Sequence, residues 1–142
     1  MSIEANKAVI RRSLEEVRNR GRYELVEELY DPAYRMPRPG LLPGVAGFRA
    51  MDAATREAFP DAHWTIEDLL AEGDRVMTSW TLRGTHLGVW RGGPPTGRPV
   101  VLRGSTVHRL VDGRIAGRSG VVESLDVLHQ VGATRVPPPV AG

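Results

Sequence analysis

The sequence predicts an α+β fold in which N-terminal helices pack against one face of a curved antiparallel sheet. Apolar residues recur every three or four positions up to about residue 58, and every second position from residue 63 onwards. The helical segments precede the strands, an order typical of α+β rather than α/β folds. The 142 residues are enough for one domain. We therefore expect one cone-shaped domain over residues 1–132, with a cavity between sheet and helices, and a flexible proline-rich tail over 133–142.

Three helices are predicted in the first half of the chain. Ile10, Leu14 and Val17 form an apolar stripe in the first helix, and Gly21 ends it with arginines in its last turn. A second helix covers residues 25–30 and stops at Asp31-Pro32. A third runs from about Gly47 to Ala58, with Phe48, Met51 and Thr55 on one face. Residues 32–44, rich in proline and glycine, are predicted as a loop that carries Tyr34 and Met36.

Four strands follow, connected as an antiparallel meander. The first covers residues 63–69, with Trp64, Ile66 and Asp68 expected on one face. The second covers 75–86 and places Val76, Thr78, Trp80, Leu82, Gly84 and His86 on one face. The third and fourth cover 99–111 and 114–122, and Asp112-Gly113 between them is a strong hairpin signal. A short apolar segment over 125–131 ends the domain.

Composition excludes several classes of site. The chain has no cysteine, which excludes disulfides, thiolate nucleophiles and cysteine-ligated metals. No histidine pair has metal-ligand spacing, so we expect no metal site. Lys7 is the only lysine, and the arginines are scattered among acids rather than gathered into a patch, which argues against nucleic-acid binding. No apolar run approaches the ~18 residues of a membrane span, and the N-terminus lacks a signal-peptide pattern. We therefore expect a cytoplasmic protein that binds no membrane.

Several segments together resemble the SnoaL-like polyketide cyclase family, within the nuclear-transport-factor-2-like superfamily of α+β cones. The segments that carry the resemblance are 6–7, 71–76, 80–88, 94–98, 109–115 and 128–132, within a match over about residues 5–132. The resemblance implies a cavity-bearing homodimer or higher homo-oligomer that works without metal or organic cofactor. Relatives close a polyketide ring by intramolecular aldol condensation, and others hydroxylate, hydrolyse epoxides or isomerise.

The chain departs from the family pattern at the two residues that handle protons. The aldol cyclases pair a histidine on the third strand with an aspartate on the fourth. The corresponding positions here are Thr106 and Gly120. The resemblance therefore does not carry the aldol mechanism to this chain.

Three other residues are candidates for catalysis. His108 shares a strand face with Thr106 and could supply a relocated imidazole, unless it is a half-buried histidine bonded to a neighbour. Glu123 could act as an acid or base if its carboxyl turned into an apolar cavity, but in water it would be a solvated strand end. Arg118, on the face of Gly120, could bind an enolate, carboxylate or phenolate, or could be a salt-bridged surface arginine.

The expected substrate-binding residues are mostly aromatic or small. Tyr34, Met36, Phe48, Trp64 and Trp80 suit a flat polycyclic ligand, and plain core packing is the alternative explanation for them. His86 either lines the cavity mouth or fixes the loop that follows it. The small residues Gly104, Thr106 and Gly120 are expected to leave volume for a bulky ligand.

Three functions remain open from the sequence. The first is a cofactor-independent cyclase or isomerase that closes or rearranges a ring of an apolar polycyclic or polyketide intermediate, as in antibiotic or other natural-product biosynthesis. It would use either a relocated acid/base or mainly orientation of the substrate. The second is epoxide hydrolysis or cofactor-free hydroxylation, for which Asp68, Arg103 or Arg118, and Glu123 are the only possible cluster. The third is a ligand-binding subunit without catalysis.

Overall fold

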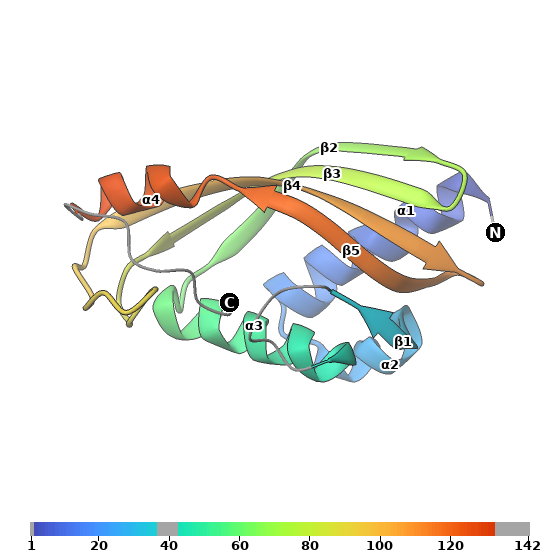
Figure 1. Cartoon of the computed structure of the whole chain (residues 1–142), viewed down its shortest axis with the longest axis horizontal. Coiled ribbons are helices and arrows are strands. Elements are labelled where there is room, and N and C mark those ends of the chain that lie inside the picture. The colour runs from blue at the N-terminus through green and yellow to red at the C-terminus, as the bar shows by residue number, and fades with distance from the viewer. Residues whose placement is uncertain (1, 37–42, 133–142) are drawn as a thin grey trace.

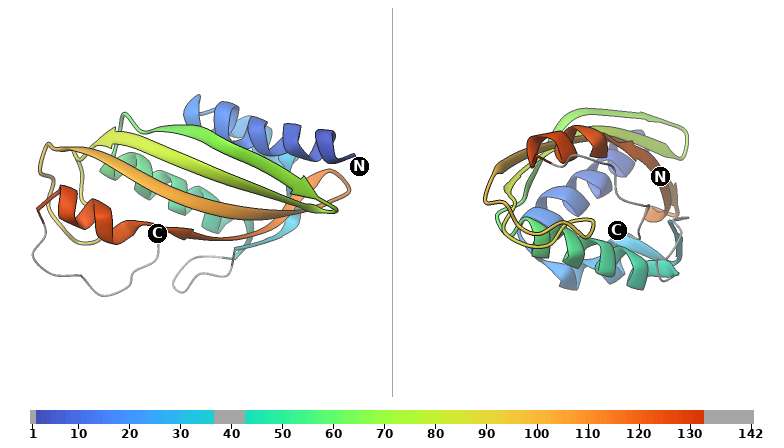
Figure 2. Two further views of the ribbon diagram at one scale, coloured as in Figure 1. Left: turned by 90° about the horizontal axis from the view of Figure 1, so that it is seen from above. Right: turned by 60° about the vertical axis from the view of Figure 1, so that its left-hand side comes forward.

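The computed structural model describes residues 2–36 and 43–132, which form one sheet curled over helices (Figure 1). The helical elements are α1 (Ile3–Arg12), the π-helical η1 (Ser13–Asn19), the 3₁₀ turn η2 (Tyr23–Leu25), α2 (Val26–Leu29), α3 (Gly44–Ala58) and α4 (Ser124–Gln130). The strands are β1 (Tyr30–Arg35), β2 (His63–Glu72), β3 (Arg75–Thr85), β4 (Pro99–Val111) and β5 (Arg114–Val122). Their order in the sheet is β1-β5-β4-β3-β2. Figure 2 shows the helices α1 and α3 inside the curve of the sheet.

The predicted α+β class and the meander from β2 to β5 are confirmed. All three consecutive pairs of these strands are antiparallel. The turn between β4 and β5 has positive φ at both Asp112 (49°) and Gly113 (77°), as a type I′ hairpin requires. The alternation in β3 also holds, since Val76, Thr78 and Leu82 are buried against the helices.

The sheet contains one strand that the sequence did not predict. Residues 30–35 fall at the predicted helix end and in the predicted loop, yet they form β1, which pairs in parallel with β5. The sheet is therefore mixed rather than purely antiparallel. Pro32 is compatible with this strand because β1 lies at the sheet edge, where a missing N–H is tolerated. The second predicted helix is correspondingly shorter and ends at Leu29.

Two further boundaries differ from the prediction. α3 begins at Gly44 instead of Gly47, and the added turn packs Val45 against the core. In β2 a register shift between Ile66 and Asp68 changes which residues face inward. Asp68 was expected beside Trp64, but it is exposed, and Leu69 takes the inward position. Residues 133–142, predicted as a tail, lie outside the described residues.

Two side-chain amides fasten helices to strands. The Asn19 amide donates to the Trp64 carbonyl at 2.9 Å, and its oxygen accepts from the Trp64 N–H at 2.8 Å. Gln130 of α4 makes the same pair of bonds with the backbone of Val101, at 2.7 and 2.9 Å. These clamps fix η1 against β2 and α4 against β4. No helix in residues 2–36 and 43–132 is both long and apolar enough to cross a bilayer.

Candidate functional site

An interior pocket of about 60 Å³ lies between η1, α3 and the inner face of the sheet. It is small compared with the roughly 300–1,000 Å³ of drug-sized ligand sites. All three tryptophans of the chain and three arginines line it: Trp64, Trp80, Trp90, Arg18, Arg91 and Arg118. No carboxylate among the described residues lines this pocket.

Trp80 occupies the space that small residues were expected to leave for a ligand. A Cβ atom added at Gly104 would collide with the Trp80 indole ring. The indole Nε1 donates to the Thr106 hydroxyl at 2.9 Å, which fixes the ring in this position. At Gly120 a Cβ would meet the backbone of Ser105, so this glycine permits close approach of β5 to β4. The small residues therefore accommodate the protein's own atoms in this conformation.

His108 is buried on the inner face of β4, opposite Arg118 of β5. Burial, and after it the positive charges of Arg118 and Arg18, lower the pKa of His108 to about 3. Its Nδ1 atom is buried without a hydrogen-bond partner. The imidazole is consequently neutral at pH 7, and it does not line the interior pocket.

Arg118 is half-buried and lines the pocket from β5. Its positive charge acts on Tyr34 as well as on His108. Burial is the larger effect at Tyr34 and raises the pKa of its hydroxyl. Tyr34 thus stays protonated beside a guanidinium in the interior of the fold.

Arg18 forms a buried ion pair that the sequence reasoning missed. Its Nε donates to the Asp52 carboxylate of α3 at 2.8 Å, and the Tyr23 hydroxyl donates to the other carboxylate oxygen. The guanidinium carbon lies 4.0 Å from the centre of the Trp64 ring. The spacing contains a signal, because Arg18 and Asp52 continue the apolar stripes of their helices four residues after Leu14 and Phe48.

The segment between β3 and β4 contributes Trp90 and Arg91 to the pocket lining. Its base is fixed by backbone bonds from Leu87 and Gly88 to the Ala58 carbonyl, at 3.0 and 3.1 Å. His86 is buried at this base and its Nδ1 contacts the Thr96 hydroxyl at 3.0 Å. It fits the expected role of fixing the loop and does not line the pocket.

Trp90 and Arg91 lie at the tip of this segment. Arg91 (φ 48°) and Gly92 (φ 76°) form a tight turn closed by two backbone bonds between Trp90 and Gly93, at 3.1 and 2.9 Å. Trp90 contacts Phe59 of α3, with 6.0 Å between ring centroids. Arg91 donates to the Ser124 hydroxyl of α4 at 3.2 Å. The tip therefore contacts both the end of α3 and the start of α4.

The structure does not bring the other predicted residues into the pocket. Glu123, Asp68 and Arg103 are exposed and do not line it. Phe48 packs in the core against Tyr30, with ring centroids 4.8 Å apart. Met36 borders a separate open hollow at the end of β1, together with Tyr34.

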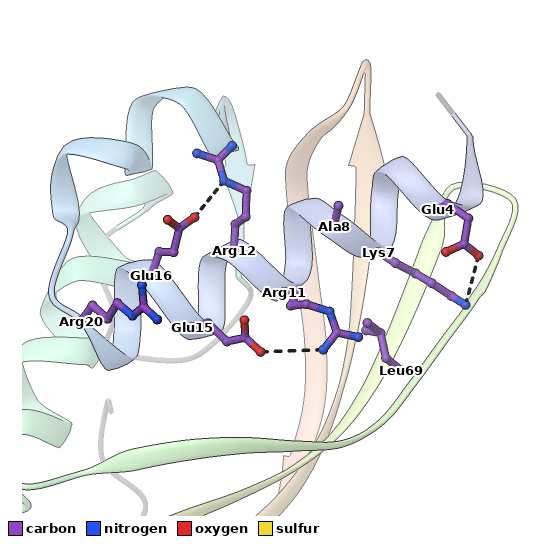
Figure 3. Close-up of a pocket in the computed structure, with 9 residues that line it drawn as sticks. All are labelled: Glu4, Lys7, Ala8, Arg11, Arg12, Glu15, Glu16, Arg20 and Leu69. Carbon is purple, nitrogen blue, oxygen red and sulfur yellow. Dashed lines mark hydrogen bonds and ion pairs between the residues drawn. The ribbon is translucent and has the colours of Figure 1, made fainter.

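A further hollow of about 480 Å³ lies on the outer side of α1 and η1 (Figure 3). Its charged residues largely neutralise one another within the helix, as in the pairs Lys7–Glu4 (3.6 Å), Arg11–Glu15 (3.7 Å) and Arg12–Glu16 (2.9 Å). These are solvent-exposed pairs of a helix surface. In the part of the chain that the structure describes, no three histidine, aspartate or glutamate side chains cluster as metal ligands would.

A sequence model of the SnoaL-like polyketide cyclase family matches residues 8–131. The chain belongs to this family. Comparison with curated protein sequences gave no significant match.

Several solved structures superpose over nearly the whole chain. TsrD from Streptomyces laurentii is 25% identical, with a TM-score of 0.87 over 94% of this chain and 98% of its own. A polyketide cyclase candidate from Acidithiobacillus ferrooxidans is 30% identical, with a TM-score of 0.79 over 92% and 97%. IdmH from Streptomyces antibioticus, another polyketide cyclase candidate, is 31% identical, with a TM-score of 0.78 over 89% and 98%. Family membership supports an enzyme of the cyclase or isomerase type that acts on a small molecule.

Proposed function

We propose that this SnoaL-like protein is a cofactor-independent cyclase or isomerase that closes or rearranges a ring of a polyketide-type intermediate. The observation that carries the proposal is the lining of the interior pocket, which combines three tryptophan side chains with three guanidinium groups. Tryptophan faces hold a flat unsaturated chain, and a guanidinium stabilises negative charge that develops on a carbonyl oxygen.

The pocket favours orientation and oxyanion stabilisation over proton abstraction. Of the two candidate acid/base residues, Glu123 faces water, and His108 is a weak base because its pKa is about 3. Ring closure by conjugate addition fits this environment. The enol form of one substrate carbonyl attacks the β-carbon of an enone and releases its O–H proton to solvent. The enolate oxygen formed in this step lies against Arg118 until solvent returns a proton to the α-carbon. A pericyclic closure would use the same polarised carbonyl, and in both reactions the product is an isomer of the substrate.

Admission of such a substrate requires more space than the described conformation offers. We propose that the tip of the segment between β3 and β4 lifts, which moves Trp90 off Phe59 and Arg91 off Ser124. This tip is held by side-chain contacts, whereas the base of the segment is held by backbone bonds. Closure over the substrate would then exclude water.

The epoxide-hydrolase alternative is not favoured by the geometry. Opening an epoxide needs carboxylates and an arginine that converge on one water. Asp68, Arg103 and Glu123 are each exposed and outside the interior pocket.

The test is reconstitution of the step in a host that expresses the genes adjacent to this one, with and without it. Without the gene, an uncyclised intermediate of unchanged mass should accumulate, and purified protein should convert it to the cyclic isomer. Arg118→Gln should lower turnover by about 10²-fold. Glu123→Gln and the outer-face control Arg103→Gln should retain full turnover. Accumulation of the same product with and without the gene, with no conversion in vitro, would support a non-catalytic binding subunit instead.

A further inference from the structure

We propose that Trp80 is the residue that limits the size of the ligand in the interior pocket. Its indole ring fills a flat subsite that Gly104 and Thr106 form on β4, so a substrate ring cannot enter this subsite while Trp80 occupies it. The inference rests on the proposed function and deepens it, because it assigns the side chain that determines which substrates fit and how they lie.

The Trp80 ring lies with its face against the backbone of β4. Trp80 and Gly104 are register partners on neighbouring strands. A Cβ atom at Gly104 would lie 2.8 Å from both Cε2 and Cη2 of the ring, and still closer to Cζ2, the atom between them. Because the three distances are nearly equal, the ring presents its face rather than its edge to Gly104. Glycine at this position is what allows the ring to lie there.

The Thr106 hydroxyl fixes the orientation of this ring. It accepts a hydrogen bond of 2.9 Å from Trp80 Nε1, and both side chains are buried. The register partner of Thr106 is Thr78, two residues before Trp80 on β3, so the indole leans along β4 from Gly104 towards Thr106. Turning the ring away would leave a buried donor and a buried acceptor unpaired, which disfavours other orientations.

Gly104 and Thr106 together form a subsite that suits a planar ring with one hydrogen-bond donor at its edge. The glycine backbone gives a flat floor, and the hydroxyl gives the acceptor. The indole of the chain itself occupies this subsite, and a pocket of about 60 Å³ is left beside it. Close-packed side chains do not yield to an added group without a cost in free energy, so the ring acts as a wall.

Two tryptophans of the lining differ in how firmly they are held. Trp80 is 6% exposed and makes a buried hydrogen bond, whereas Trp90 is half-buried and packs on Phe59. A substrate therefore displaces Trp90 rather than Trp80, and its wider ring system lies towards the segment between β3 and β4. Trp80 then selects substrates by size, and Thr106 acts through Trp80 as a positioning residue.

Indole and indene test the subsite, because they have the same shape and only indole has an N–H group. In Trp80→Ala the vacated place keeps its glycine floor and its Thr106 acceptor. We expect indole to bind this variant at least about tenfold more tightly than the natural protein, and to raise its melting temperature. Adding Thr106→Val, which removes only the acceptor, should lower the ratio of indole to indene affinity about fivefold, as measured by calorimetry.

Trp90→Ala is the matched control. It removes an identical ring from the same pocket, but this ring is half-buried and packs on Phe59 rather than on a glycine. Water can fill the vacated place, so indole should bind Trp90→Ala at least about tenfold more weakly than Trp80→Ala. Trp80→Val, whose β-branched side chain suits a strand, is the second variant if Trp80→Ala does not fold, which circular dichroism and thermal unfolding show.

Three binding results would overturn the inference. They are equal indole affinity of the natural protein and Trp80→Ala, equal affinity of Trp80→Ala and Trp90→Ala, and a ratio of indole to indene affinity that Thr106→Val leaves unchanged.

The reconstituted reaction gives a second readout. Trp80→Ala should release additional cyclic isomers, and saturating indole should restore the single product by replacing the lost ring; an unchanged product profile in Trp80→Ala would overturn the size limit. Indole binding requires no turnover. It can therefore fail while the natural protein still cyclises its substrate, and it can succeed where no cyclisation is found.

Discussion

Lowering the pH from about 7.5 to about 5 should reduce the free energy of unfolding by about 2 kcal/mol more in the natural protein than in a His108→Gln variant. His108 has a pKa of about 3 in the folded protein and an ordinary value of 6.5 in the unfolded chain. Above pH 6.5 the imidazole is neutral in both states and contributes no pH dependence. Below it, the unfolded chain binds a proton that the folded protein excludes, so stability falls as the pH falls.

The magnitude follows from proton linkage. Each pH unit between the two pKa values costs about 1.4 kcal/mol, so the 1.5 units from 6.5 to about 5 give about 2 kcal/mol. The loss continues towards pH 3 and then levels off. The cause is burial first and the positive charges of Arg118 and Arg18 second. Burial also lowers the pKa of His86, but this group is present in both proteins and cancels in the comparison.

Urea unfolding followed by tryptophan fluorescence measures the effect at the two pH values. Glutamine is the chosen replacement because it can hydrogen-bond but does not titrate in this range. An identical loss of stability in the two proteins would refute the reasoning, since His108 would then titrate alike in the folded and unfolded states.

Three further predictions concern stability. Arg18→Met should destabilise the protein by about 3–5 kcal/mol because it leaves Asp52 buried without its cation. The double variant with Asp52→Met should lose much less stability, and equal drops in the urea midpoints of the single and double variants would contradict this. Gly104→Ala should cost about 1–3 kcal/mol because its Cβ meets the Trp80 ring, with partial recovery when Trp80 is replaced by Phe, as thermal unfolding would show. Arg91→Gly should hold or raise the melting temperature, since it relieves about 1 kcal/mol of left-handed backbone strain, and a clear drop would count against that view.

Local patterns were sufficient to predict most of the framework. The change from helical to alternating periodicity located α3 and the four strands of the meander, and Asp112-Gly113 located one hairpin. These signals depend on neighbouring residues alone. The edge strand β1 was missed because its partner lies far along the chain and Pro32 argues locally against a strand. The register shift near Asp68 likewise leaves no local pattern.

The site was predicted less completely for a physical reason. Sequence placed Trp80, Thr106 and His108 on the inner face of the sheet, which the structure confirms. It gave no means to see that Trp80 would turn over Gly104, since that depends on the packing of two strands. The Arg18–Asp52 pair joins separate helices, and from the sequence Arg18 was interpreted only as one of the arginines in the last turn of the first helix.

The parallel pairing of β1 with β5 has a consequence for biosynthesis. Tyr30 and Ile115 are register partners although about 85 positions separate them. This contact has a large loop-closure entropy cost, and it cannot form before the C-terminal strand has been synthesised. Pairing of β1 with β5 is therefore a late folding event of high contact order. During vectorial synthesis on the ribosome, the helical elements from α1 to α3 and the β2–β3 hairpin emerge well before β5. Until then the aromatic side of β1, with Tyr30 and Tyr34, has no sheet to join, and this is the stage at which a nascent chain would most benefit from a chaperone.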